Sequence, residues 1–283
     1  MKYGKNINIL PIDSYLKCTL ANWTGVVYKI PRTELENCKE RDDLKQSGVY
    51  VLFGTNEEKE EKMIYVGQAN ERKNGEGVLS RLQEHKRNPK KDYWTEAIVF
   101  VTSNNSFGAT EISYLESRFC ELAIQANRYI VRNENHPTSG NITEEKASEL
   151  EEFIEYAQII TDVMGYKLFT PFVSNSTKKK TTTINSVDNF LYYKNAIAKQ
   201  TEEGIVLLKG SKINPKTSPK CPKAVKNHRK KYKNKVKNIN GECVLIKDIL
   251  FSSPSAAVSY VNGYSENGKA KWKNSDGKTL NEI

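Results

Sequence analysis

Residues 48–68 of this chain contain two apolar runs separated by a charged segment. The stretch opens with GVYVLFG at residues 48–54 and closes with MIYVGQ at residues 63–68. Both runs are apolar and rich in β-branched residues, whereas TNEEKEEK at residues 55–62 is polar and charged. Two short apolar runs joined by such a segment are typical of a β-hairpin. Tyr50 and Tyr65 are therefore predicted to lie on neighbouring strands.

The residues around this hairpin predict further strands and helices. Residues 7–46 mix short apolar runs with polar breaks, which indicates two or three strands and a short helix. Downstream, apolar spacing predicts a helix, a strand and two more helices at residues 78–88, 96–103, 109–128 and 143–165. The fold class is predicted to be α+β, with a small central antiparallel β-sheet flanked by helices.

The chain is long enough for two domains at 283 residues. Residues 174–186, SNSTKKKTTTINS, are polar and low in complexity, which favours an interdomain linker. We predict a first domain at residues 1–172 with a core at 45–135, a linker at 173–203 and a smaller α/β domain at 204–283, with Phe190 as the alternative start of the second domain.

The positive charge of the chain lies almost entirely in this last segment. Residues 204–283 hold 17 Lys and Arg against 5 Asp and Glu, a net charge of +12. The first 203 residues hold the remaining 27 against 29, a net charge of −2. This asymmetry indicates a polyanionic partner, with nucleic acid favoured over acidic protein or a membrane surface. Simple solubility is the alternative explanation.

The cysteines and histidines exclude several kinds of site. The five cysteines are scattered, odd in number and without a CxxC pair, so neither a disulfide framework nor a zinc ribbon is predicted. With only three histidines, any metal site would rely on oxygen ligands, which suits magnesium. We find no long apolar run and no apolar stretch near the N-terminus, so the sequence predicts a cytoplasmic protein without a membrane partner.

Two of the predicted helices carry polar residues that are candidates for a functional site. Glu116 falls on the apolar side of the helix at residues 109–128, where a carboxylate needs either a cation in an ion pair or a metal ion. Arg81 and His85 lie four residues apart and share a face of the earlier helix. They suit phosphate binding and proton transfer, or the commoner roles of a surface Arg and a core-edge His.

The order of these residues resembles the GIY-YIG nuclease superfamily over roughly residues 45–135. The resemblance lies in GVY at 48–50, YVG at 65–67, Arg81 with His85, and YLESRF around Glu116. The C-terminal segments GIVLLKGSKI, FSSPSAAVSYVNG and WKNSDGKTL resemble a domain of unknown function that is often appended to bacterial GIY-YIG nucleases. These likenesses imply a metal-dependent endonuclease that hydrolyses phosphodiester bonds in DNA, in defence, restriction or repair.

The resemblance also implies roles for individual residues. Tyr50 is favoured as the base that activates water and Tyr65 as the residue that orients water and phosphate, although the two roles could be exchanged. His85 would assist the tyrosine, Arg81 would stabilise charge on the phosphate, and Glu116 would hold Mg²⁺ or Mn²⁺. The remaining supporting positions, which simple strand punctuation also explains for the glycines, are Gly48, Gly67 and Asn133.

DNA contacts are expected in two places. Gln68 stands where many members of the superfamily carry Lys or Ser, so a phosphate contact would be lost or replaced by Arg72 or Lys73. In the basic C-terminal segment, the residues expected to contact the DNA backbone are Lys226, Arg229, Lys230, Lys231 and Lys233.

Two other classes of function stay open at this point. The chain could be a catalytically silent GIY-YIG-like module that binds nucleic acid or docks a protein. It could also be a structural subunit that uses the C-terminal domain as its docking surface. For a nuclease, cutting both strands with a single site requires either a homodimer or two successive nicks.

Overall fold

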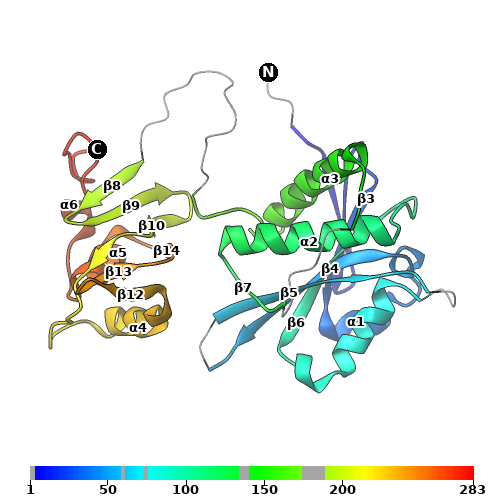
Figure 1. Ribbon diagram of the computed structural model, residues 1–283, viewed down its shortest axis with the longest axis horizontal. Coiled ribbons are helices and arrows are strands. Elements are labelled where there is room, and N and C mark those ends of the chain that lie inside the picture. The colour runs from blue at the N-terminus through cyan, green and yellow to red at the C-terminus, as the bar shows by residue number, and fades with distance from the viewer. Residues whose placement is uncertain (1–3, 59–60, 73–75, 134–139, 174–188) are drawn as a thin grey trace. The chain divides into compact units, whose positions relative to one another are not determined.

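The computed structural model describes residues 4–58, 61–72, 76–133, 140–173 and 189–283. The chain divides into two compact units, residues 1–171 and residues 172–283 (Figure 1). Within the described parts of the chain, no helix combines the length and the apolar character that crossing a bilayer requires.

The first unit is built on a seven-stranded sheet with the strand order β1-β2-β3-β6-β4-β5-β7. Its strands are β1 (Ile7–Ile12), β2 (Tyr15–Leu20), β3 (Gly25–Pro31), β4 (Gly48–Asn56), β5 (Glu61–Ala69), β6 (Trp94–Thr102) and β7 (Ile130–Val131). All neighbours are antiparallel except β5 and β7. The sheet is larger than the small one predicted, because β3 pairs with β6 along its whole length and brings β1 and β2 with it.

Helices cover both faces of this sheet (Figure 1). One face carries α1 (Val78–Arg87), and the other carries α2 (Ala109–Ala126) and α3 (Glu144–Val163). Alternation along β4 divides its side chains between two cores, with Val49 and Val51 facing α2 and Tyr50 and Leu52 facing α1. The predicted mixture of an antiparallel sheet and flanking helices is therefore confirmed in this general form.

Proline sets the end of α1. Asn88 precedes Pro89, and the ring of a proline disfavours the helical conformation in the residue before it. Helix α1 therefore ends at Arg87. The Asn88 side chain then accepts a hydrogen bond from the backbone of Lys90 and caps the 3₁₀ helix η3 (Pro89–Lys91). Two further 3₁₀ helices, η1 (Arg32–Cys38) and η2 (Asp42–Leu44), occupy the place of the predicted short helix.

The second unit contains two antiparallel sheets, with the strand orders β14-β10-β9-β8 and β11-β13-β12. Its strands are β8 (Phe190–Tyr193), β9 (Ala196–Thr201), β10 (Gly204–Leu207), β11 (Lys212–Ile213), β12 (Val236–Ile239), β13 (Glu242–Leu245) and β14 (Ile249–Phe251). Its helices are α4 (Lys223–Lys231), η4 (Lys233–Lys235), α5 (Pro254–Asn262) and α6 (Gly268–Lys271).

The strands of the second unit begin at Phe190, the earlier of the two predicted starts, and not at Gly204. Residues 190–201 were assigned to the linker, but they form the hairpin of β8 and β9. Leu191, Ala196 and Ala198 pack in the same core as Trp272, which explains why this short segment is strand and not linker. The rest of the predicted linker up to residue 188 lies outside the described residues, apart from its first residue.

Candidate active site

The two tyrosines of the hairpin lie on the α1 face of the sheet. Tyr50 on β4 lies directly opposite Gly67 on β5, and Leu52 lies opposite Tyr65. Tyr50 and Tyr65 are therefore diagonal neighbours on one face, and their ring centroids are 6.5 Å apart. Tyr50 is buried with 1% of its surface exposed, whereas Tyr65 is partly exposed.

Gly67 is required by the position of the Tyr50 ring. The phenol of Tyr50 lies across the Cα atom of Gly67, and a Cβ atom there would collide with the hydroxyl and with Cζ. A glycine is needed at position 48 for a different reason. A Cβ atom there would lie 2.9 Å from the carbonyl oxygen of Phe100 on β6. The first glycine thus shapes the site, and the second permits close packing of the sheet.

Helix α1 brings Arg81 and His85 onto the tyrosines. The Tyr50 hydroxyl lies 2.6 Å from Nε2 of His85, and the two groups share a hydrogen bond. The His85 ring also contacts Tyr65, with ring centroids 5.6 Å apart. Arg81 hydrogen-bonds the Tyr50 hydroxyl and forms a 2.6 Å ion pair with Glu84. These four side chains, predicted from three separate segments, lie together.

Burial keeps both members of the Tyr50 and His85 pair neutral. Desolvation raises the pKa of Tyr50, and the charge of Arg81 opposes that rise. Desolvation, with Lys91 and Arg81 nearby, lowers the pKa of His85 to about 3. At neutral pH the imidazole is therefore uncharged and has one nitrogen able to accept a proton.

Glu116 approaches the same place from the opposite face of the sheet. It projects from α2, where its carboxylate is half-buried and hydrogen-bonded by the side chain of Gln68 near the end of β5. Burial raises the pKa of Glu116, and Arg81 lies close enough for its charge to oppose this. Glu116 also acts electrostatically on Tyr50, so the carboxylate belongs to the same cluster.

Asn133 holds the strand that carries Tyr65. Its side-chain oxygen accepts a hydrogen bond from the backbone N–H of Val66 at 3.0 Å, and its amide donates to the Val66 carbonyl at 2.8 Å. The side chain thereby continues the pairing of β7 with β5 beyond Val131. Asn133 fixes the backbone between Tyr65 and Gly67 without touching either ring.

Lys91 and Glu84 belong to the site although sequence reasoning did not single them out. The Lys91 ammonium lies 3.6 Å from the centroid of the Tyr65 ring, in a cation–π contact. Glu84 accepts hydrogen bonds from Arg81 and from Arg72. Glu84 could have been found from its three-residue spacing from Arg81. Lys91 follows a proline break, so no periodicity links it to His85.

The carboxylate that the cluster can offer to a metal ion is Glu116, because Arg81 and Arg72 already engage Glu84. Within the described residues, no three His, Cys, Asp or Glu side chains gather closely enough to hold one. Mg²⁺ commonly keeps several waters and binds through one or two carboxylates together with substrate phosphates, so Glu116 alone fits this mode. The buried Oε1 of Gln68 beside it has no hydrogen-bond partner among the described residues, and it is suited to accept from a metal-bound water.

One family model matches part of the chain, within the second unit. Residues 192–283 match the family model of a domain of unknown function, DUF4357. This match bears out the predicted C-terminal domain of unknown function, and it includes part of the β8 and β9 hairpin. It does not extend to the cluster on the first unit. No curated protein and no solved structure matched the chain.

The basic residues predicted to contact DNA in the second unit differ in their exposure to solvent. Lys226, Lys230, Lys231 and Lys233 are exposed on α4 and on η4. Arg229 was expected to contact DNA, but its guanidinium points inward and donates to the backbone carbonyls of Asn214, Tyr260 and Val261. Its burial also lowers its pKa, so Arg229 supports the fold of this unit.

The two basic residues expected near the first site also differ. The side chain of Arg72 is half-exposed and forms ion pairs with Glu76 at 3.1 Å and with Glu84 at 2.6 Å. A phosphate would have to compete with both carboxylates for this guanidinium. Lys73 lies outside the described residues.

Proposed function

We propose that the chain is a metal-dependent endonuclease that hydrolyses phosphodiester bonds in DNA through the cluster around Tyr50. The observation that carries the proposal is the 2.6 Å contact of the Tyr50 hydroxyl with Nε2 of His85, beside Arg81. A proton acceptor and a phosphate-binding cation in contact are what hydrolysis of a phosphodiester needs. The likeness to GIY-YIG nucleases in motif order supports the same reaction.

The proton acceptor in this proposal is the Tyr50 and His85 pair. In the tautomer that carries its hydrogen on Nδ1, His85 accepts the hydroxyl hydrogen of Tyr50 at Nε2. Tyr50 can then take a proton from the attacking water while it passes its own proton to His85. The water oxygen bonds to phosphorus as the bond to the leaving oxygen breaks, and the leaving oxygen takes up a proton from solvent. Because burial raises its pKa, Tyr50 is protonated at neutral pH. It can therefore accept a proton from water only while it gives its own proton to His85.

Binding of a phosphate prepares His85 for this role. The positive charges of Lys91 and Arg81 help to hold the pKa of His85 near 3 in the free protein. A phosphodiester next to these two cations would offset their charge, so the pKa of His85 would rise and the imidazole would become a better acceptor. Proton transfer is thus coupled to substrate binding.

The partly exposed residues set the side from which the substrate enters. Tyr65 and Arg81 are partly exposed, and Glu116 is half-buried beside Gln68. Arg81 would contact the non-bridging oxygens and stabilise the charge that develops on them. Tyr65 would orient the phosphate and the water. Glu116 would hold Mg²⁺, which when bound supplies Lewis-acid stabilisation of the phosphate oxygens.

A plasmid-nicking assay tests this proposal. Supercoiled DNA is incubated with the full chain and Mg²⁺, with an EDTA arm, and compared with Glu116→Gln. The matched control is Glu121→Gln, because Glu121 lies on the same helix with its side chain exposed. The expected result is nicking that EDTA and Glu116→Gln abolish and Glu121→Gln preserves. Binding without cleavage of supercoiled, linear or branched DNA would favour a silent binding module.

A further inference from the structure

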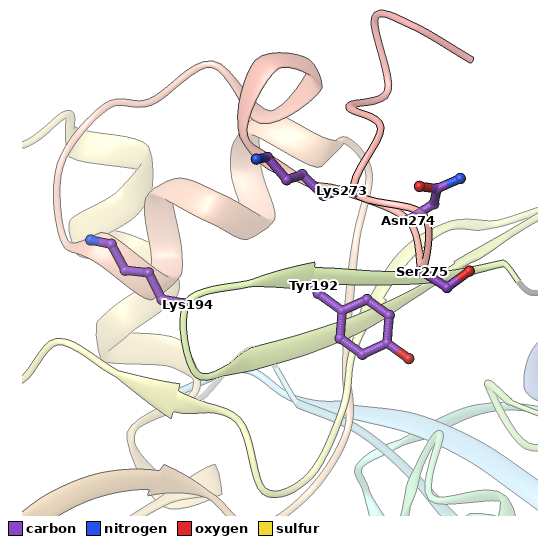
Figure 2. A pocket seen from close by; sticks show the side chains of 6 residues that line it. Tyr192, Lys194, Lys273, Asn274 and Ser275 are labelled. Carbon is purple, nitrogen blue, oxygen red and sulfur yellow. The ribbon is translucent and has the colours of Figure 1, made fainter.

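A shallow hollow lies on the DUF4357 region, next to the edge strand β8. Its volume is about 550 Å³. Figure 2 shows the hairpin end of β8 beside the segment that follows Trp272. The hollow is lined by Tyr192, Lys194, Lys273, Asn274, Ser275 and Gly277. Two lysines and no carboxylate stand among these six residues.

Tyr192 presents an aromatic ring to this hollow. Leu191 and Tyr193 face the core of the unit, so Tyr192 between them faces outward. It is 40% exposed. On one side it forms an antiparallel bridge with Lys273, and on the other it pairs with Ile197. In Figure 2 its ring extends from β8 away from the Lys194 side chain.

The outward surface continues along the sheet with the same composition. Phe190 lies two residues before Tyr192 and therefore on the same face, and it pairs with Lys199. The Lys199 ammonium lies 5.1 Å from the Phe190 ring centroid. Ile197 is 41% exposed. Aromatic rings two residues apart on an open sheet, interleaved with lysines, are how sheet-based modules stack the bases of single strands.

The polar groups of the hollow suit a nucleotide as well. Lys273 is exposed, whereas Lys194 hydrogen-bonds Asn262 at 3.1 Å and also Tyr193, so its ammonium group is engaged on the core side of β8. Ser275 is exposed on the turn that closes the hollow. Asn274 holds this turn by accepting from the backbone of Asp276 and Lys278, so its oxygen is engaged in structure.

We propose that this surface binds single-stranded nucleic acid, with a base stacked on Tyr192 and a neighbouring phosphate next to Lys273, which pairs with Tyr192. A duplex does not fit this chemistry, because its base faces are covered by neighbouring bases. A symmetric contact between two copies fits poorly, because it would bring the lysines of both copies together. The site is distinct from the exposed lysines of α4, which carry no neighbouring exposed ring.

This inference extends the proposed endonuclease, since it supplies a way to hold an unpaired strand, but it does not depend on cleavage. Binding can be measured in EDTA, where no metal-dependent cleavage occurs. Loss of cleavage in the plasmid assay would leave the binding result unaffected, and the two proposals therefore fail separately.

Fluorescence anisotropy with the full chain tests the site. Labelled single-stranded DNA, single-stranded RNA and duplex DNA of equal length are titrated in EDTA against the unmodified protein, Tyr192→Ala, Tyr192→Phe and Lys273→Ala. Ile239→Ala and Lys247→Ala are the matched controls, because Ile239 and Lys247 are exposed elsewhere in the same unit. The DNA and RNA arms show which single strand is preferred.

We expect Tyr192→Ala to weaken single-strand binding by about fivefold or more, and Tyr192→Phe to stay within about twofold because the stacking ring is kept. Lys273→Ala should reduce the slope of log affinity against log salt by about 0.7. Unchanged affinity in Tyr192→Ala would overturn the proposal. An equal loss of affinity for duplex DNA in Tyr192→Ala would also overturn it. A change in the sedimentation of Tyr192→Ala without a change in affinity would overturn it as well, and would identify the surface as a protein interface.

Discussion

The Tyr50 hydroxyl and Nε2 of His85 lie 2.6 Å apart, although 35 positions separate the two residues in the chain. Strand β4 fixes the tyrosine and α1 fixes the histidine, so neither is free to move away from the other. Gly67 leaves room for the ring, and Arg81 adds a charged donor to the same hydroxyl. A buried phenol and a neutral imidazole in this arrangement form a unit for proton transfer.

Replacing Glu116 should separate stability from activity. Burial raises the pKa of this carboxyl, which means that holding it charged at neutral pH costs the folded state free energy. Glu116→Gln removes that charge and should raise the thermal midpoint at pH 7, while the nicking rate falls by about a hundredfold or more. Calorimetry of Glu116→Gln beside Glu121→Gln checks this. A lower midpoint in Glu116→Gln alone would show that the carboxylate stabilises the fold.

His85 should make the stability depend on pH. Its folded pKa of about 3 lies below the unfolded value of about 6.5, so the unfolded state binds the proton more readily. The free energy of unfolding should therefore fall as the pH drops from about 6.5 towards 3, and His85 should contribute at most about 1.4 kcal/mol per pH unit to this fall. Urea unfolding across this range should show a steeper dependence in the unmodified protein than in His85→Gln. Equal slopes would mean that His85 is not held neutral.

Lys91 should tune the same histidine. Its charge is the second cause, after burial, of the lowered pKa of His85. Lys91→Met should move the pKa of the His85 imidazole upward in an NMR titration, whereas Lys91→Arg should keep it low. Lys90→Met is the control, because Lys90 is an exposed neighbour on η3. A His85 titration that is the same in Lys91→Met and Lys90→Met would count against this coupling.

Gly67 should not tolerate a side chain. A methyl group there meets the Tyr50 ring, which is packed between the sheet and α1, so Gly67→Ala should lower the free energy of unfolding by about 1–3 kcal/mol. Gly140→Ala is a suitable control, because the added methyl would meet only Thr110 at an ordinary distance of 3.5 Å. Its effect should stay within about 0.5 kcal/mol. Chemical denaturation measures both. Similar stability of the two variants would disprove the role given to Gly67.

Much of the first unit could be predicted from local pattern. The two apolar runs around Tyr50 and Tyr65 predicted the hairpin, and the spacing of Arg81 and His85 predicted their shared helix face. The size of the sheet was not predictable in this way. The pairing of β3 with β6 joins residues about 70 positions apart, and no local periodicity reports such a contact.

The sequence alone did not show which charged side chains are exposed and which are held by the fold. Arg229 lies in the same basic run as the exposed lysines of α4. From composition alone, all of these residues were therefore predicted to contact DNA. What separates them is the position of three backbone carbonyls around its guanidinium, from Asn214 and the end of α5. Lys91 was missed for a related reason, since its contact with Tyr65 depends on how the chain turns after Pro89.

The most direct test of the proposed site is a double-mutant cycle on the rate of DNA cleavage with Tyr50→Phe and His85→Gln. If the pair transfers the proton as a unit, each single variant should lose about 10²- to 10⁴-fold, and the double variant should be no slower than the slower single one. Circular dichroism would check that all variants stay folded. Cleavage by either single variant at the unmodified rate, or losses that multiply in the double variant, would contradict the account.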